Sequence, residues 1–248
     1  MPAETSVRDR RRAETVREIK AAALDQLAEA GPGGLSLRGI ARAVGMTVQS
    51  LYHYFDSRDA LLTELIREGH DDLADAVRAA ADATRGEPPA RRRVAATTAF
   101  RTWALAHRPA FLLLFGTPVP GFAPDPAAGT GLAAWRLAAP FADVLFDGWT
   151  PAQLAAVPLP PGGEPLASLT QPPPPAPLRD DYDRRAATLP PGALALFIEL
   201  RGRMHGLVML ELLNHLAPLQ EHGEALLVAM TSRMSGELDA LRAGLPAG

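Results

Sequence analysis

The chain has 248 residues, 47% of them hydrophobic, and a formal net charge of −3. This length and apolar content are enough for a sizeable core in one large domain or two unequal ones. The chain has no cysteine, which excludes disulfide scaffolds, thiol catalysis and cysteine-ligated metal centres. The negative net charge also argues against indiscriminate binding to polyanions.

Neither an export signal nor a membrane anchor is predicted. The N-terminal residues lack an apolar signal core, and the longest apolar runs, such as Phe111–Phe115, are far shorter than a bilayer span. We therefore expect a cytoplasmic protein that does not enter a membrane.

The first predicted element is a helix whose apolar face runs from Val16 to Leu27 and which ends at the turn 31–34. An arm containing Arg10 to Arg12 precedes it. Basic residues only slightly outnumber acidic ones among the first sixty residues. Affinity for phosphate must therefore come from the placement of individual cations, such as those of the arm along a minor groove.

Residues 36–55, SLRGIARAVGMTVQSLYHYF, are the most informative stretch. From Leu37 to Val44, apolar residues recur at helical spacing. Gly45 suits the left-handed turn after a helix, and the side-chain oxygen of Thr47 can cap a second helix. Two short helices joined by a tight turn are therefore predicted.

The second of these helices is too polar for a core element, because only Leu51 and Phe55 are purely apolar. Small, hydrogen-bonding and aromatic side chains fill the other positions, as in a helix that reads duplex DNA from the major groove. An ordinary helical corner with a polar surface helix has the same spacing. The neighbouring residues have to decide between these two interpretations.

Further helices are predicted after this motif. Ser57 can cap a long helix with an apolar face over 61–77. Another helix spans 91–107, where Pro109 disfavours its continuation, and helical pattern resumes over 110–115.

The middle of the chain is rich in proline and glycine. The segment 116–131 is expected to be a loop in which Phe122 alone could pack on the body. Pro140 predicts a kink in a helix over 132–146. A Pro-rich loop of polyproline character is expected at about 150–178.

Two long helices, over about 192–216 and 223–241, end the chain. They are more apolar than a single amphipathic stripe requires, so each is expected to pack on two sides. Pairing across a two-fold axis would create a four-helix dimer interface from residues of about 192–241. A helical hairpin within a monomeric core explains the same pattern.

Three segments together favour the DNA-binding interpretation: AAALDQLAEAG, LSLRGIARAVGMTVQSLYHYF and DSRDALLTELI. Over residues 12–67 they resemble the tetracycline-repressor (TetR) family. Later segments, RTWALAHRPAFLLLFG, PVPGF and RMHGLVMLEL, look like the C-terminal domain subclass named for a Trp-His-Gly motif, with Met204 where that motif has tryptophan. Only His205 and Gly206 of the motif are retained.

The resemblance implies an all-α fold. Residues 1–60 would form an N-terminal arm and a three-helix helix-turn-helix domain, and residues 61–248 a larger helical bundle that binds an effector and dimerises. It also implies a homodimer on duplex DNA, acting most often as a repressor. Such a repressor leaves a near-palindromic operator when a small, mostly apolar effector binds.

The second helix of the motif, over about 47–54, is the predicted DNA-reading helix. Its residues and those next to it are assigned to DNA by their chemistry. One group offers contacts to base edges, with Gln49 best suited to a bidentate contact to adenine. These residues are Val48, Gln49, Ser50 and His53. Hydroxyl groups and cations fix the register through phosphates without reading the sequence. The residues assigned to phosphates are Arg38, Thr47, Tyr52, Tyr54 and Arg58.

Aromatic and polar residues of the C-terminal part are candidates for an effector cavity. They are Arg101, Trp103, His107, Phe111, Phe115, Trp135, Phe141 and His205. The aromatic rings could instead fill the core. Likewise, His205 could be a core histidine bonded to the backbone or to Arg101.

Two other functions compete with this interpretation. A DNA-binding protein without a ligand switch has the same N-terminal motif. A helical-bundle enzyme is disfavoured because HExxH, GxSxG and GxGxxG are absent, and the only lysine, Lys20, follows no Gly-rich loop. The spacing of His205, Glu211 and His215 does not put all three on one helix face. We therefore expect no catalytic residues, no metal and no cofactor.

Overall fold

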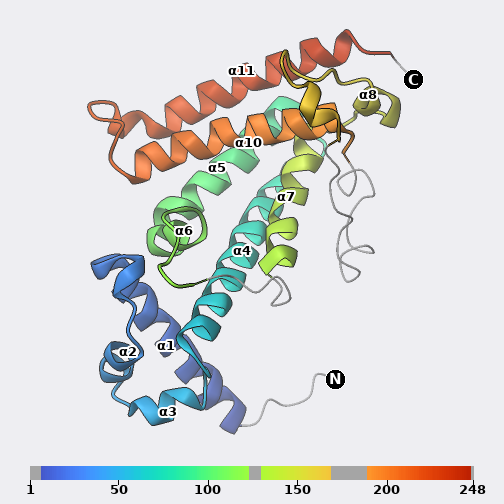
Figure 1. The fold of residues 1–248 in the computed structure, drawn as a ribbon. Helices are drawn as coiled ribbons and strands as arrows, with labels where there is room; N and C mark the ends of the chain where they lie inside the picture. Colours follow the sequence, from blue (N-terminus) through green and yellow to red (C-terminus); the bar gives the residue numbers. More distant parts are fainter. Residues whose placement is uncertain (1–6, 123–129, 169–188, 247–248) are drawn as a thin grey trace. The chain divides into compact units, whose positions relative to one another are not determined.

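The computed structural model describes residues 7–122, 130–168 and 189–246, with the backbone alone for Pro32 and residues 130–135. Regular structure in these ranges is entirely helical, which confirms the expected all-α fold (Figure 1). The helices form two compact units, residues 1–69 with 107–131, and residues 70–106 with 132–248. The sequence placed the boundary near residue 60, whereas the units divide within helix α4.

The first unit is built around a small apolar core. Its elements are α1 (Val7–Ala30), α2 (Leu37–Val44), α3 (Val48–Tyr52), the start of α4 (Arg58–Ala83) and α6 (Arg108–Phe115). Ile19, Ile40, Leu51 and Leu61 are fully buried in this core, one from each of the first four helices. Phe122 packs against the same cluster, so it contacts the first unit and not the C-terminal body on which the sequence placed it.

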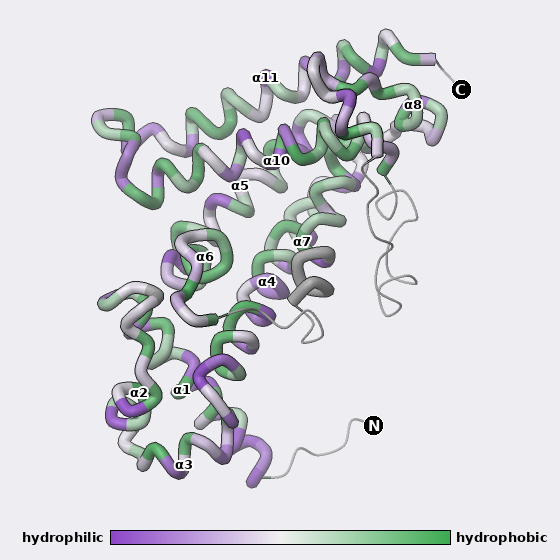
Figure 2. Tube along the Cα trace, in the orientation of Figure 1, coloured by the Kyte–Doolittle hydropathy of each residue, from purple (hydrophilic) through white to green (hydrophobic). Residues whose placement is uncertain are grey.

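The second unit is a bundle of longer helices. Its elements are the end of α4, α5 (Pro89–Ala106), α7 (Thr130–Leu145), α8 (Pro151–Ala155), α10 (Pro191–Leu212) and α11 (Gly223–Ala243). Helices α10 and α11 lie side by side, and both pack against α5 (Figure 1). Apolar residues recur along all three helices (Figure 2). Among the described residues, no helix combines the length and apolarity needed to cross a membrane.

Buried polar groups connect the helices of the second unit. Arg93 of α5 is only 1% exposed. Its guanidinium donates to the carbonyl oxygens of Val144 and Leu145 at 3.3 and 3.0 Å and to Asp239 at 3.2 Å. The hydroxyls of Thr97 and Thr231 meet at 3.1 Å between α5 and α11. These buried groups therefore have the partners that a stable core requires.

Proline and glycine shape the rest of this unit. Pro140 lies inside α7, where a proline was expected to kink or break the helix. Helix α8 was not predicted; Thr150 and Gln153 form a reciprocal capping box at its start. Gly192 opens α10 where a Cβ atom would lie 2.0 Å from the carbonyl oxygen of Val157, so no larger residue fits. Much of the expected Pro-rich loop lies outside the described residues.

Candidate nucleic-acid interface

The candidate interface begins with a helix fixed by local hydrogen bonds. The side chain of Ser36 caps α2 by accepting from the backbone N–H of Gly39 at 3.3 Å. The backbone N–H of Ser36 donates to Gln26 of α1 at 3.0 Å. The start of α2 is therefore tied to α1, which fixes where Arg38, exposed on its first turn, projects.

A tight turn then sets the angle between α2 and α3. Gly45 adopts a left-handed conformation with φ 74°, as predicted, and the N–H of Met46 donates to the carbonyl of Ala41 at 2.8 Å. Thr47 caps α3 by accepting from the N–H of Ser50 at 3.1 Å. The same hydroxyl lies 2.8 Å from the Ser50 hydroxyl. Thr47 and Ser50 thus already have one polar partner each.

Helix α3 divides into a buried and an exposed side. Leu51 is fully buried and Phe55 is 8% exposed, so both anchor the helix in the core of the first unit. The assigned residues on the exposed side are Thr47, Gln49, Tyr52 and His53. Those that are half-buried are Val48, Ser50 and Tyr54. Val48 and Tyr54 also pack against the core, which leaves Gln49 and His53 as the most accessible hydrogen-bonding groups for a base edge.

The arginine-rich start of the chain is helical, not an extended arm. Helix α1 begins at Val7 and includes Arg10 to Arg12. Arg12 lies over the ring of Tyr54, 5.0 Å from its centroid, and its Nη2 donates to the carbonyl of His53 at 3.4 Å. This cation–π contact joins the start of α1 to the end of the reading helix.

A shallow hollow of about 530 Å³ adjoins this contact. It is lined by Val7, Arg8, Arg11, Arg12, Thr15 and Tyr54. Three guanidinium groups beside a tyrosine hydroxyl suit the oxygen atoms of a phosphate backbone. The sequence singled out Arg10 to Arg12 and Tyr54 separately, but their meeting depends on a contact across more than forty residues, and Arg8 was missed.

Ion pairs connect α1 and α4 in the first unit. Lys20 of α1 pairs with Glu64 and Glu68 of α4 at 3.0 and 2.9 Å. The hydrogen bonds from Arg67 and Lys20 hold the pKa of Glu64 at about 2, despite partial burial. Arg58 opens α4 with its side chain 28% exposed and Asp59 at 3.8 Å. It lies at the helix start, where the sequence placed a phosphate contact.

The effector candidates are divided between the two units. Trp103 and Phe141 are buried in the second unit, and Phe100 packs its ring 5.7 Å from that of His205. Arg101 is bound to Glu211 through two hydrogen bonds of 2.5 and 2.7 Å. The hole beside Phe141 is only about 20 Å³, room for about one water molecule.

The remaining effector candidates belong to the first unit or have no described side chain. His107, Phe111 and Phe115 belong to the first unit, where the two phenylalanine rings pack at 4.9 Å. The side chain of Trp135 lies outside the described residues. Among the described residues, no group of three His, Asp or Glu side chains comes together to hold a metal ion.

Comparison with known proteins identifies the family. Residues 19–65 match the family model of bacterial regulatory proteins of the tetR family, and residues 93–234 match that of the tetracyclin repressor-like C-terminal domain. The chain belongs to the TetR family. Its members are transcriptional regulators that bind DNA through the helix-turn-helix, not enzymes. The finer resemblance to the Trp-His-Gly subclass stays a prediction.

Individual relatives agree with this TetR assignment. The chain is 40% identical over 123 residues to the HTH-type transcriptional regulators Rv1816 of Mycobacterium tuberculosis and Mb1846 of Mycobacterium bovis. The match covers 50% of this chain and 52% of each relative, so the chain spans about half the length of these curated relatives.

Solved structures extend the similarity to most of the chain. The crystal structure of the regulatory protein SCO4313 is 30% identical, with a TM-score of 0.69, over 93% of this chain and 100% of that one. The TetR family regulator PfmR of Thermus thermophilus shares the fold at 15% identity, with a TM-score of 0.53 over 92% and 98% of the two chains.

Proposed function

We propose that this TetR-family protein is a ligand-responsive repressor that acts in the cytoplasm as a homodimer on a near-palindromic operator. The observation that carries the proposal is the division of α3. Leu51 anchors the helix in the core, while Gln49, Tyr52 and His53 stay exposed on a helix of fixed direction. A helix held in this way can enter a major groove with its polar side toward the bases.

Each accessible residue has a role in this proposal. Gln49 reads an adenine through its amide, and His53 reaches a base edge or sugar at the end of the helix. Tyr52, Arg38 and Arg58 contact phosphates and set the register. Val48 and Ser50, half-buried, add van der Waals and water-mediated contacts. The cations beside Tyr54 follow the backbone next to the reading helix.

The proposed dimer interface lies on α10 and α11. One side of α10 exposes Ile198 and Leu210, with Gly202 and Gly206 between them, and the exposed Leu213 follows just after its end. A Cβ atom added at either glycine would meet no atom within 4 Å, so this stripe is open. An exposed apolar stripe on a soluble helix is typical of a surface that pairs with another copy. The pairing would set the distance between two reading helices, roughly 34 Å apart for successive major grooves.

A bulky substitution tests this interface. Gly206→Trp has room in the free subunit but blocks close approach of two helices, so a monomer is expected in analytical ultracentrifugation. Asp75→Trp, on an exposed position of α4, is the matched control and keeps the dimer. A Gly206→Trp variant that remains a dimer with unchanged operator affinity contradicts the proposed interface.

The effector acts through differential affinity. It releases DNA only if it binds the DNA-incompetent form more tightly than the DNA-bound form. The hole beside Phe141 is too small for an effector, so a protein that relied on that place alone would have a second function, DNA binding without a ligand switch. Thermal-shift measurements over a set of small apolar molecules separate the two functions, because only the switch predicts a ligand that both stabilises the protein and weakens operator binding.

The DNA-binding assignment is tested with the DNA that flanks the protein's own gene. Gel-shift and footprinting should locate a near-palindromic site. Gln49→Ala should relax the preference at one operator position, whereas Arg58→Ala should weaken binding to all sequences and lower the salt slope by about one. Unchanged footprints and affinities for both variants would show that α3 is not placed as proposed.

A further inference from the structure

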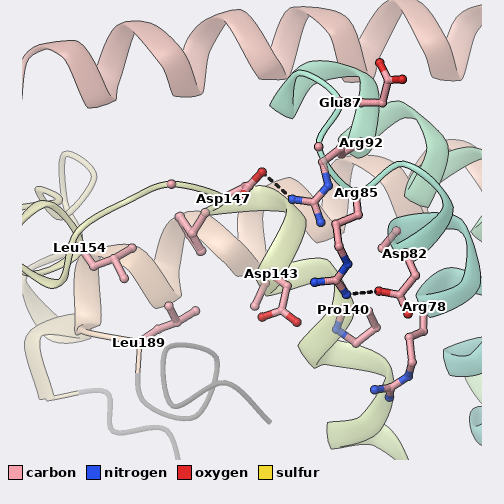
Figure 3. Close-up of a pocket in the computed structure, with 15 residues that line it drawn as sticks. Arg78, Asp82, Arg85, Glu87, Arg92, Pro140, Asp143, Asp147, Leu154 and Leu189 are labelled. Atoms are coloured by element: carbon pink, nitrogen blue, oxygen red, sulfur yellow. Dashed lines mark hydrogen bonds and ion pairs between the residues drawn. The ribbon is translucent and has the colours of Figure 1, made fainter.

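A cavity of about 590 Å³ lies in the second unit, and its lining includes none of the described residues that were assigned to an effector from the sequence. The end of α4 and the start of α5 form one wall, and the end of α7 forms another (Figure 3). Its size falls in the range of roughly 300–1,000 Å³ that small-molecule sites occupy.

The cavity has a charged and an apolar side. In Figure 3 the guanidinium groups of Arg85 and Arg92 point toward its middle, Asp143 approaches from α7, and Asp147 approaches from the turn just after α7. Leu154 and Leu189, only 5% and 6% exposed, lie at its other end. A molecule that fills the space therefore meets charges at one end and carbon atoms at the other.

Arg92 is a charged residue of the lining with N–H groups that remain able to donate. Its side chain is 12% exposed, and Nη1 donates to Asp147 at 2.5 Å. Its Nε is buried and has no acceptor among the described residues. A guanidinium has five N–H donors in a fork that matches a carboxylate. The remaining donors of Arg92 are thus suited to an anionic oxygen pair.

The acidic side chains of the lining are already engaged, which disfavours a cationic ligand. Asp82 is bound by Arg85 at 2.5 Å, and Glu87 has Arg91 at 3.7 Å. Asp143 likewise already takes part in a polar or electrostatic interaction within the protein. A cation entering the cavity would compete with these arginines, whereas an anion adds to the unfilled donors of Arg92.

We propose that this cavity binds an organic carboxylate whose apolar ring or chain extends toward Leu154 and Leu189. The carboxylate accepts hydrogen bonds from Arg92, and Arg85 adds a second cation. The proposal that a carboxylate binds here depends on the cavity alone. The effect of that binding on regulation rests on the proposed function. A ligand held between the end of α4 and α7 biases the position of α4, the helix that begins in the DNA-binding unit at Arg58.

Phenylbutanoate tests the charge and shape of the proposed ligand. Its uncharged analogue is phenylbutanamide, and its cationic analogue is phenylbutylamine. Isothermal titration should give saturable binding of the carboxylate in the millimolar range or tighter, and weaker binding of both analogues. No saturable carboxylate binding at millimolar concentration, or equal binding of all three molecules, overturns the proposal.

Variants locate the binding. Arg92→Met should weaken carboxylate binding by about tenfold or more, because a charge-assisted hydrogen bond is lost. Arg91→Met is the matched control: Arg91 is adjacent, 73% exposed and outside the cavity lining. The double variant Arg92→Met with Asp147→Asn leaves no unpaired carboxylate, so it separates a loss of binding from a loss of folding. Carboxylate binding that survives in this folded double variant overturns the proposal.

A gel-shift with phenylbutanoate distinguishes the proposed carboxylate site from the proposed ligand-responsive repressor function. Binding that depends on Arg92 but leaves operator affinity unchanged supports the site and contradicts the ligand switch for this molecule. Loss of operator affinity without dependence on Arg92 contradicts the site and leaves the switch in place.

Discussion

In the first unit Arg38 and Arg42 are exposed on α2, and in the described part of the chain their guanidinium groups have no hydrogen-bond or ion-pair partner. In the second unit Arg93 and Arg101 lie between helices and hold carbonyl and carboxylate oxygens. The same side chain thus remains free for an external phosphate in one unit and connects helices in the other. Removing the charge should therefore lower the unfolding free energy by different amounts in the two units.

The buried pair of Arg101 and Glu211 should show the largest effect. The Glu211 side chain is 4% exposed, and Arg101 donates to both of its oxygens. Arg101→Met leaves this carboxylate buried without its main partner, so the unfolding free energy of the second unit should fall by about 3–5 kcal/mol. Urea unfolding followed by tryptophan fluorescence measures this, because Trp103, Trp135 and Trp149 all belong to the second unit.

Arg203→Met is the control for that experiment. Arg203 pairs with Glu199 and Glu237, but its side chain is 40% exposed. Loss of an exposed pair should cost under about 1 kcal/mol. Equal losses for the two variants would remove the proposed distinction between connecting and surface arginines.

The second unit should also lose stability in mild acid. Burial, and then the charge of Arg201, lower the pKa of His205 from 6.5 to about 4. Burial and Arg201 likewise lower the pKa of His70 to about 4, against the opposing charge of Asp71. Because the unfolded histidines bind protons first, their contribution to stability is complete above about pH 6.5 and is lost as the pH falls toward 4.

Urea unfolding across this pH window measures the effect. The unfolding free energy should rise with pH between 4 and 6.5, and the rise should be smaller in a His70→Gln, His205→Gln variant. The two histidines face Arg201 from α4 and α10, and Asp71 is the acid beside His70. A variant with the same pH dependence as the original chain would show that other groups titrate there.

The two units also differ in how much the sequence could predict. The capping hydrogen bonds of Ser36, Gly45 and Thr47 reach no farther than four residues along the chain, so the turn and both short helices followed from local chemistry. The pairs Arg93–Asp239 and Arg101–Glu211 span 146 and 110 residues. No local pattern marks such partners, because they meet only after the bundle has packed.

The candidate site shows the same limit. The sequence identified every exposed residue of α3, yet it could not tell that Val48 and Tyr54 pack on the core. It placed Arg12 in an arm, whereas the contact with Tyr54 depends on how α1 crosses the end of α3. For the effector it chose mainly aromatic residues, of which Trp103, Phe111 and Phe141 are buried, and that choice stays a prediction. No local pattern marks the charged cavity of the second unit, because arginines and acids far apart in the chain line it.

The helix cap of α3 should have a smaller effect than the buried pair. Thr47→Ala removes the oxygen that accepts from the Ser50 N–H, so the first unit should lose about 1 kcal/mol. Thr47→Ser keeps the oxygen and is the matched control. Amide hydrogen exchange over residues 48–52 reports on this helix. If amide exchange is faster in both variants, the loss of the threonine methyl group causes the effect, and the capping hydrogen bond does not.

Arg38→Met should change stability least and DNA binding most selectively. An exposed side chain without an internal partner contributes within about 0.5 kcal/mol to folding. If Arg38 binds a phosphate, its removal lowers the salt slope of operator binding by about one without changing base preference.

Arg42 is the natural control, since it is equally exposed one turn later on the same helix but is assigned no phosphate. Arg42→Met should leave the slope unchanged. Because the two positions differ only by one helical turn, a slope that falls for Arg42 and not for Arg38 would show that the end of α2, next to the Gly45 turn, faces the DNA. That result would contradict the phosphate contact proposed for Arg38.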